Sequence, residues 1–165
     1  MKIKTKEICL YGLLGVLMFA LKFIMSSLPN IEPVSLLLMS FAVTFGVKAI
    51  YPLSVYIILE MLIYGFGFWS IGYLYIWPVL VAVALLINKV TNNSFLWAVV
   101  SGLFGLIFGA LYIPLYLISG GFTFAITWWI SGLPYDFIHC VSNFILCLIL
   151  FKPITNTLSK FKEWY

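Results

Sequence analysis

Hydrophobic residues run in long blocks along this chain, and short polar or Gly/Pro-rich stretches separate the blocks. Blocks of this length are typical of helices that cross a lipid bilayer, because a crossing takes ~20 apolar residues. We predict six spans at about residues 8–28, 33–47, 49–66, 74–87, 95–118 and 122–151. They predict an all-α integral membrane protein, a six-transmembrane-helix bundle that forms a single domain over residues 1–165.

Prolines and glycines mark the boundaries. Pro29-Asn30-Ile31-Glu32-Pro33 cannot continue a helix, and a glycine-rich aromatic turn over residues 65–73 separates the third and fourth spans. The last block is 30 residues long, which is more than one span requires. Pro134 lies inside it and predicts a break or kink.

Composition then excludes whole classes of protein. Hydrophobic residues make up 64% of the chain and charged residues only 8%, whereas soluble chains are ~25% charged. A soluble enzyme and a nucleic-acid-binding module are both excluded. The chain also has one histidine and no recognisable catalytic, metal-ligand or phosphate-loop motif, so we expect no enzyme activity, cofactor or metal.

The lysines predict the topology. If the N-terminus is inside and the chain crosses six times, eight of the nine lysines fall on the cytoplasmic side: Lys2, Lys4, Lys6, Lys48, Lys89, Lys152, Lys160 and Lys162. Positive charge concentrates in cytoplasmic loops. We therefore expect both termini in the cytoplasm and a multi-pass protein of a bacterial cell membrane.

A few ionisable residues lie inside apolar blocks, where each costs ~2.5–3.5 kcal/mol or more. Lys22 could pair with either Glu60 or Asp136. Asp136, His139 and Asn143 share one helical face by their spacing. That face is either a ligand site or a structural network that ties the last span to its neighbours.

Aromatic residues crowd the predicted outer ends of spans three to six: Trp69, Tyr73, Tyr75, Trp77, Tyr112, Tyr116, Trp128, Trp129 and Tyr135. They form either an interfacial belt or the walls of a pocket. The inner ends carry few comparable rings. That asymmetry favours a pocket, because a belt has two sides.

Small residues predict close helix packing. Ser101, Gly105 and Gly109 recur every four residues, and we expect them to pack within the fold. Gly12 and Gly15 lie near the inner end of the first span and could pack within the fold or dock a partner.

Several stretches together resemble the substrate-binding S component of energy-coupling factor (ECF) vitamin transporters, an ABC importer family. The stretches are residues 29–35, 59–67 and 131–144, followed by Leu150-Phe151-Lys152-Pro153. The resemblance implies capture of a vitamin or vitamin precursor, here a small heteroaromatic one, from outside in a pocket at the outer helix ends. It also implies a membrane T component and two cytoplasmic ATPase subunits as partners, with ATP hydrolysis on the partners.

On that resemblance we predict thirteen substrate-binding residues: Lys22, Asn30, Glu32, Glu60, Tyr64, Trp69, Tyr73, Trp77, Trp128, Tyr135, Asp136, His139 and Asn143. Gly12 and Gly15 are the candidate docking residues, although their spacing departs from the family's Ala-xxx-Ala stripe. Two alternatives stay open: a non-transport membrane scaffold of the MreD-like cell-shape type, and a small carrier that transports without partners.

Overall fold

The computed structural model describes residues 4–163, and within them every regular element is a helix. The elements are α1 (Thr5–Ile24), α2 (Val34–Phe45), the 3-10 turn η1 (Gly46–Ala49), α3 (Ile50–Tyr64), α4 (Phe68–Ile87), α5 (Ser94–Ile107), the 3-10 turn η2 (Ala110–Tyr112) and α6 (Ile113–Glu163). The predicted all-α class is confirmed. Of the cytoplasmic lysines predicted above, Lys2 lies outside the described residues.

Four stretches are long and apolar enough to cross a membrane: Thr5–Ile24, Val34–Tyr64, Phe68–Ile87 and Ala110–Lys162. Two of them are interrupted. Gly46 has φ 66° between α2 and α3, and Gly121 has φ 78° within α6. Both values lie in the left-handed region that glycine adopts without steric cost. These apolar helices are compatible with a multi-pass membrane protein.

The start of α4 and the end of α5 differ from the predicted boundaries. The turn before α4 covers only residues 65–67, so α4 begins at Phe68 and not near residue 74. The side chain of Ser70 supports that start because it accepts a 3.1 Å hydrogen bond from the backbone N–H of Gly67. α5 ends at Ile107 and not near residue 118.

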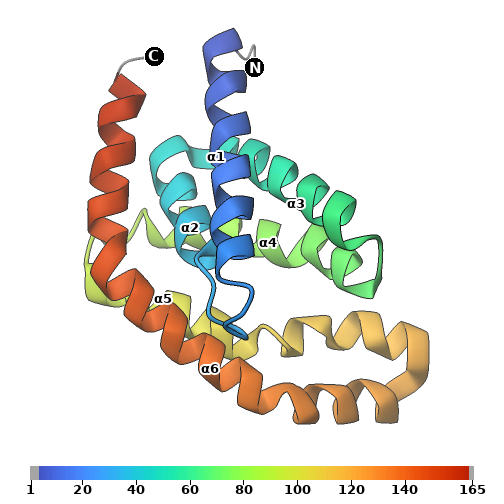
Figure 1. The fold of residues 1–165 in the computed structure, drawn as a ribbon. Helices are drawn as coiled ribbons and strands as arrows, with labels where there is room; N and C mark the ends of the chain where they lie inside the picture. The colour runs from blue at the N-terminus through green and yellow to red at the C-terminus, as the bar shows by residue number, and fades with distance from the viewer. Residues whose placement is uncertain (1–3, 164–165) are drawn as a thin grey trace.

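α6 is longer than predicted and differs in where it breaks. It continues past residue 151 to Glu163 and passes through Pro134 without losing its helical assignment. The non-helical residue is Gly121. In Figure 1 the orange part of α6 runs obliquely beneath the other helices, and its red part turns upward beside α1.

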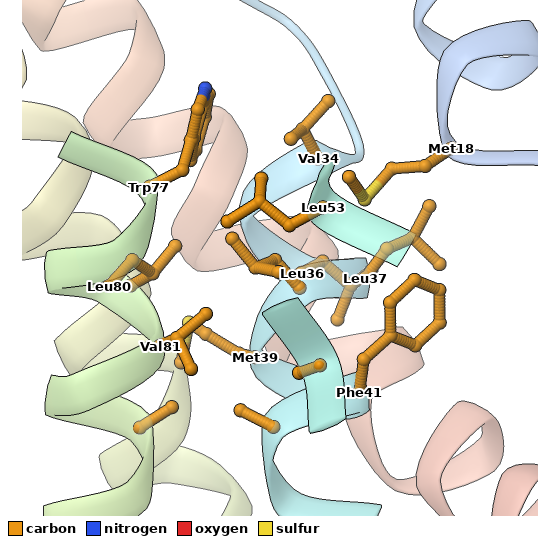
Figure 2. Packing of buried hydrophobic residues seen from close by; sticks show 14 of the residues in the cluster. Met18, Val34, Leu36, Leu37, Met39, Phe41, Leu53, Trp77, Leu80 and Val81 are labelled. Atoms are coloured by element: carbon orange, nitrogen blue, oxygen red, sulfur yellow. The ribbon is translucent and has the colours of Figure 1, made fainter. Parts of the chain in front are cut away.

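α2 forms the centre of the core. All of its residues except Val43 are buried. A helix that is apolar on every face is covered by protein or by lipid, and α2 packs against α4, α6 and η1. Figure 2 shows Leu36 and Met39 of α2 between Leu53 on one side and Leu80 and Val81 on the other.

The two ends of the molecule differ in chemistry. The start of α1 and the end of α6 lie at the same end (Figure 1). There Lys48 forms an ion pair with Glu7, and Lys162 Nζ donates a 2.7 Å hydrogen bond to the carbonyl of Thr44. The connection over residues 25–33 follows the opposite end of α1 and borders the cavity described next.

Candidate functional site

A cavity of about 420 Å³ lies beside the connection over residues 25–33, between the end of α1 and the helices α3 and α4. Nine of the thirteen predicted site residues line it: Lys22, Asn30, Glu32, Glu60, Tyr64, Trp69, Tyr73, Trp77 and His139. The volume lies in the range of small-molecule sites, ~300–1,000 Å³. The structure thus brings together residues that are more than a hundred positions apart.

Lys22 and Glu60 form an ion pair across the cavity wall. The Glu60 side chain is almost fully buried, and the Lys22 side chain is 25% exposed. Of the two partners that the sequence allowed for Lys22, the structure has Glu60. A buried carboxylate needs such a partner, because removing its counter-charge is strongly destabilising.

Three tyrosine rings surround the Lys22 ammonium. Its Nζ lies 5.9 Å from the ring centre of Tyr56, 5.5 Å from that of Tyr64 and 5.6 Å from that of Tyr73. Cations within ~6 Å of a ring face gain cation–π attraction. The ammonium is therefore satisfied by one carboxylate and by aromatic faces.

Glu32 occupies the start of α2. Its carboxylate accepts hydrogen bonds from the backbone N–H groups of Val34 and Ser35 and from the Ser35 hydroxyl at 3.0 Å. The His139 ring lies 3.1 Å from it through Nε2. Burial raises the pKa of the Glu32 carboxyl, but these hydrogen bonds and the His139 ring outweigh burial, so the pKa is lowered overall. A carboxylate at a helix N-terminus also gains from the helix dipole.

The connection before α2 is tied to α6. Asn30 has φ 56°, a left-handed conformation that asparagine tolerates better than most residues. Its carbonyl accepts a 3.0 Å hydrogen bond from the Ser142 hydroxyl. Together with the Glu32–His139 contact, this bond holds the rim of the cavity against the last helix.

Flat rings form the deep wall. The ring of Trp77 lies 5.5 Å from Tyr73, 6.4 Å from Tyr56 and 5.4 Å from Phe108, centre to centre. Trp69 lies 5.3 Å from Tyr73 in an edge-on arrangement. Figure 2 shows the Trp77 ring nitrogen on the side away from the aliphatic residues Leu80 and Val81. The nitrogen end of the Trp77 indole therefore points away from these aliphatic core residues (Figure 2).

The other four predicted residues lie away from the cavity. Trp128 packs on Tyr116 with ring centres 4.1 Å apart, and Tyr135 is 53% exposed. Asn143 is buried against α5, where its side-chain Nδ2 lies 3.4 Å from the carbonyl of Ser101.

Asp136 contacts the end of α5. One carboxylate oxygen accepts a 3.1 Å hydrogen bond from the backbone N–H of Gly109, just past the last residue of α5. Asp136 is buried, and a side chain at position 109 would collide with its carboxylate. This contact ties α6 to the end of α5, while the second carboxylate oxygen has no hydrogen-bond partner among the described residues.

The small residues pack within the fold where they touch neighbours. A Cβ at Gly105 would lie 2.8 Å from the backbone carbonyl of His139, so α5 and α6 approach closely there, as expected. A Cβ at Gly15 would lie 2.6 Å from Val55 in α3. Gly15 therefore serves intramolecular packing, whereas Gly12 has open space beside it.

Two ring residues of the wall were missed by the sequence analysis. Tyr56 is four residues before Glu60 and therefore lies on the same face of α3, a spacing that could have identified it. Phe108 lies just after α5 and contacts His139 at 5.0 Å between ring centres. Its position depends on the end of α5, which the local sequence does not show.

A second concave surface lies between α1 and the last part of α6, with α2 as its floor. This apolar groove has a volume of about 480 Å³. It is lined by Leu10, Leu14, Leu17, Leu21, Leu37, Phe41, Pro153, Ile154, Thr157, Leu158 and Phe161. None of the predicted site residues lines it.

Comparison of the chain with protein-family models, with curated proteins and with solved structures found no match. Over residues 4–163, no group of three or more histidine, cysteine, aspartate or glutamate side chains is placed to hold a metal ion.

Proposed function

We propose that this protein is the high-affinity substrate-binding subunit of an ECF-type importer. It captures a small heteroaromatic vitamin or vitamin precursor from outside a bacterial cell membrane. In this proposal the chain crosses the membrane six times with both termini in the cytoplasm, and the cavity opens at the outer side.

One observation carries the proposal. The cavity combines a buried ion pair, a wall of flat rings and a rim fixed by hydrogen bonds, and it lies at the end of α1 away from the termini. Ionisable groups within apolar helices are costly and are usually retained for function. A structural protein would gain the same stability from apolar side chains of similar volume.

The partners follow from the same proposal. A T component in the membrane and two cytoplasmic ATPases supply the energy, and this chain itself hydrolyses nothing. α1 offers a docking face, because Leu13, Val16 and Leu17 are exposed and Gly12 has open space beside it. Gly15 packs against α3 and leaves Gly12 as the remaining small residue on this helix near its inner end.

Intrinsic fluorescence tests the proposal. Trp69 and Trp77 line the cavity, whereas Trp97 is buried against Phe151. A vitamin or precursor that binds should change the emission of the purified protein in a saturable way. Trp69→Phe should remove part of that change, and Trp97→Phe should not.

Absence of a saturable change for every compound of a vitamin and precursor panel would contradict the proposal. Proteoliposomes separate it from a self-sufficient carrier. The chain alone should bind substrate without moving it, and uptake should require the T component, the ATPases and ATP.

A further inference from the structure

Three buried polar atoms of the cavity wall have no hydrogen-bond partner in the part of the chain that the structure describes. They are Oε1 of Glu60, the hydroxyl of Tyr56 and Nε1 of Trp77. All three side chains are at least 98% buried. Unpaired buried polar groups are rare and costly, and a bound ligand or water is one common partner for them.

The chemistry of these atoms defines the groups that a ligand must offer. Oε1 of the Glu60 carboxylate can accept a hydrogen bond. It is available to a ligand, because Lys22 donates to the other oxygen, Oε2. Nε1 of Trp77 can only donate, and the Tyr56 hydroxyl can do either. A complementary ligand therefore carries at least one N–H or O–H donor and at least one acceptor.

The rings around these atoms define the ligand's shape. Tyr56 and Tyr73 stack with an interplanar angle of 20°, and Trp77 meets both of them nearly edge-on. Aromatic walls of this kind accept flat ring systems through offset stacking or edge contacts. The volume of about 420 Å³ fits a small bicyclic compound more closely than a large cofactor.

The charges of the lining exclude one class of ligand. Its ionisable groups are already paired, Lys22 with Glu60 and His139 with Glu32. Over residues 4–163, Lys22 is the one lysine that lines the cavity, and it is bound to a carboxylate; a second carboxylate, Glu32, lies at the rim. A carboxylate or phosphate on the ligand would meet two like charges and no unpaired cation, which is unfavourable in a buried site.

Resting on the proposed function, we infer that the substrate is a neutral or cationic flat heteroaromatic ring with an amino group beside a ring nitrogen. The amino N–H donates to Oε1 of Glu60. The ring nitrogen accepts from Trp77 Nε1 or from the Tyr56 hydroxyl. No anionic group enters the deep part of the cavity.

Matched ligands test this inference on the unmodified protein. 4-Aminoquinazoline, 4-methylquinazoline and quinazoline-4-carboxylate share one ring system and differ only at position 4. Competition with the best compound of the vitamin panel should rank the amino compound about tenfold or more above the methyl compound, the effect of one hydrogen bond to a charged group. The carboxylate should bind most weakly.

Variants test the assigned atoms. Tyr56→Phe and Trp77→Phe remove the polar atom and keep a ring, and Glu60→Gln removes the charge. Glu60→Gln should reduce the preference for the amino compound over the methyl compound. At least one of Tyr56→Phe and Trp77→Phe should weaken both compounds alike, because both carry the ring nitrogen. Tyr51→Phe is the matched control, because Tyr51 stacks on Tyr11 outside the cavity and should leave the preference unchanged.

The outcomes separate the two proposals. Equal binding of the amino and methyl compounds, tighter binding of the carboxylate, an unchanged preference in Glu60→Gln, or unchanged affinity in both Tyr56→Phe and Trp77→Phe would each overturn the inference. A panel vitamin that binds while the amino ring does not compete would overturn the inference and leave the proposed function standing. If no panel compound and no quinazoline binds, both fail.

Discussion

The cavity and the apolar groove have similar volumes, about 420 and 480 Å³, but their chemistry differs completely. The cavity is lined by an ion pair, a second carboxylate, a histidine and several aromatic rings. The groove is lined by aliphatic and aromatic side chains, with Thr157 as its one polar side chain. Size alone therefore does not identify a substrate site.

Unpaired polar atoms distinguish the two regions. Three of them line the cavity, and none of those found over residues 4–163 belongs to the groove. An apolar groove facing lipid is satisfied by acyl chains or by another apolar helix, since neither needs a hydrogen bond. The cavity needs a partner with polar groups of its own.

Removal of the Lys22 charge from the cavity should lower the unfolding free energy more than any other change considered below. Lys22→Met leaves the buried Glu60 carboxylate without its cation, and we expect a loss of about 3 kcal/mol of unfolding free energy. The double variant Lys22→Met/Glu60→Gln should recover most of the loss. Unfolding in detergent micelles by added denaturant measures both.

Lys48→Met provides the control for that experiment. Lys48 pairs with Glu7 at the other end of the molecule, and both side chains there are partly exposed. Its effect should be clearly smaller. Equal losses for Lys22→Met and Lys48→Met, or additive losses in the double variant, would contradict the assignment of a buried pair.

Asp136 is a buried carboxylate outside the cavity and provides the next test. Asp136→Ala leaves the Gly109 N–H without its acceptor and should cost about 1–3 kcal/mol. Asp136→Asn should cost less, because the amide oxygen can still accept. Both variants should bind ligand within about twofold of the original protein, as independent sites do. A tenfold loss of affinity in Asp136→Asn would place this residue in the binding site after all.

A paired substitution compares the two concave surfaces directly. Trp69→Leu removes one aromatic ring from the cavity and should weaken ligand binding by about two- to tenfold, from ~0.5–1.5 kcal/mol of ring contact. Leu17→Ala changes the groove and should leave affinity unchanged. Isothermal titration with the best panel compound measures both. The reverse pattern would move the site to the groove.

The smallest expected effect concerns pH at the rim. The pKa of Glu32 lies below its ordinary value of 4.5, so its stabilising contribution is full above that pH. It is lost as pH falls through the lower pKa of the folded state. The melting temperature of the original protein should therefore fall towards that of Glu32→Gln as pH falls below 4.5. A constant difference in melting temperature between the original protein and Glu32→Gln from pH 7 to pH 3 would contradict a stabilising role for the Glu32 carboxylate.

Local sequence patterns predicted those parts of the molecule that local forces determine. The apolar blocks and the polar residues in apolar helices are both visible in one stretch of chain. Lys22 and Glu60 could be identified as unusual in this way, because charge in an apolar block is rare. Which partner Lys22 takes depends on how α1 and α3 pack, and the sequence left it open.

The predictions on α6 were less accurate for a physical reason. α5 ends at Ile107 because the chain turns there and Gly109 bonds to Asp136, a contact between residues 27 positions apart. The sequence analysis did not foresee that turn and placed Trp128 and Tyr135 near the outer ends of the spans with the other aromatic residues. Tertiary contacts of this kind have no signature in local hydrophobic periodicity.

Native mass spectrometry tests the central claim, that the cavity binds one small molecule, most directly. The purified protein is incubated with the vitamin and precursor panel, next to Trp69→Leu and Leu17→Ala. We predict one adduct, at one molecule per chain, that Leu17→Ala retains and Trp69→Leu weakens. No adduct with any compound, or an adduct that Leu17→Ala removes and Trp69→Leu retains, would contradict the claim.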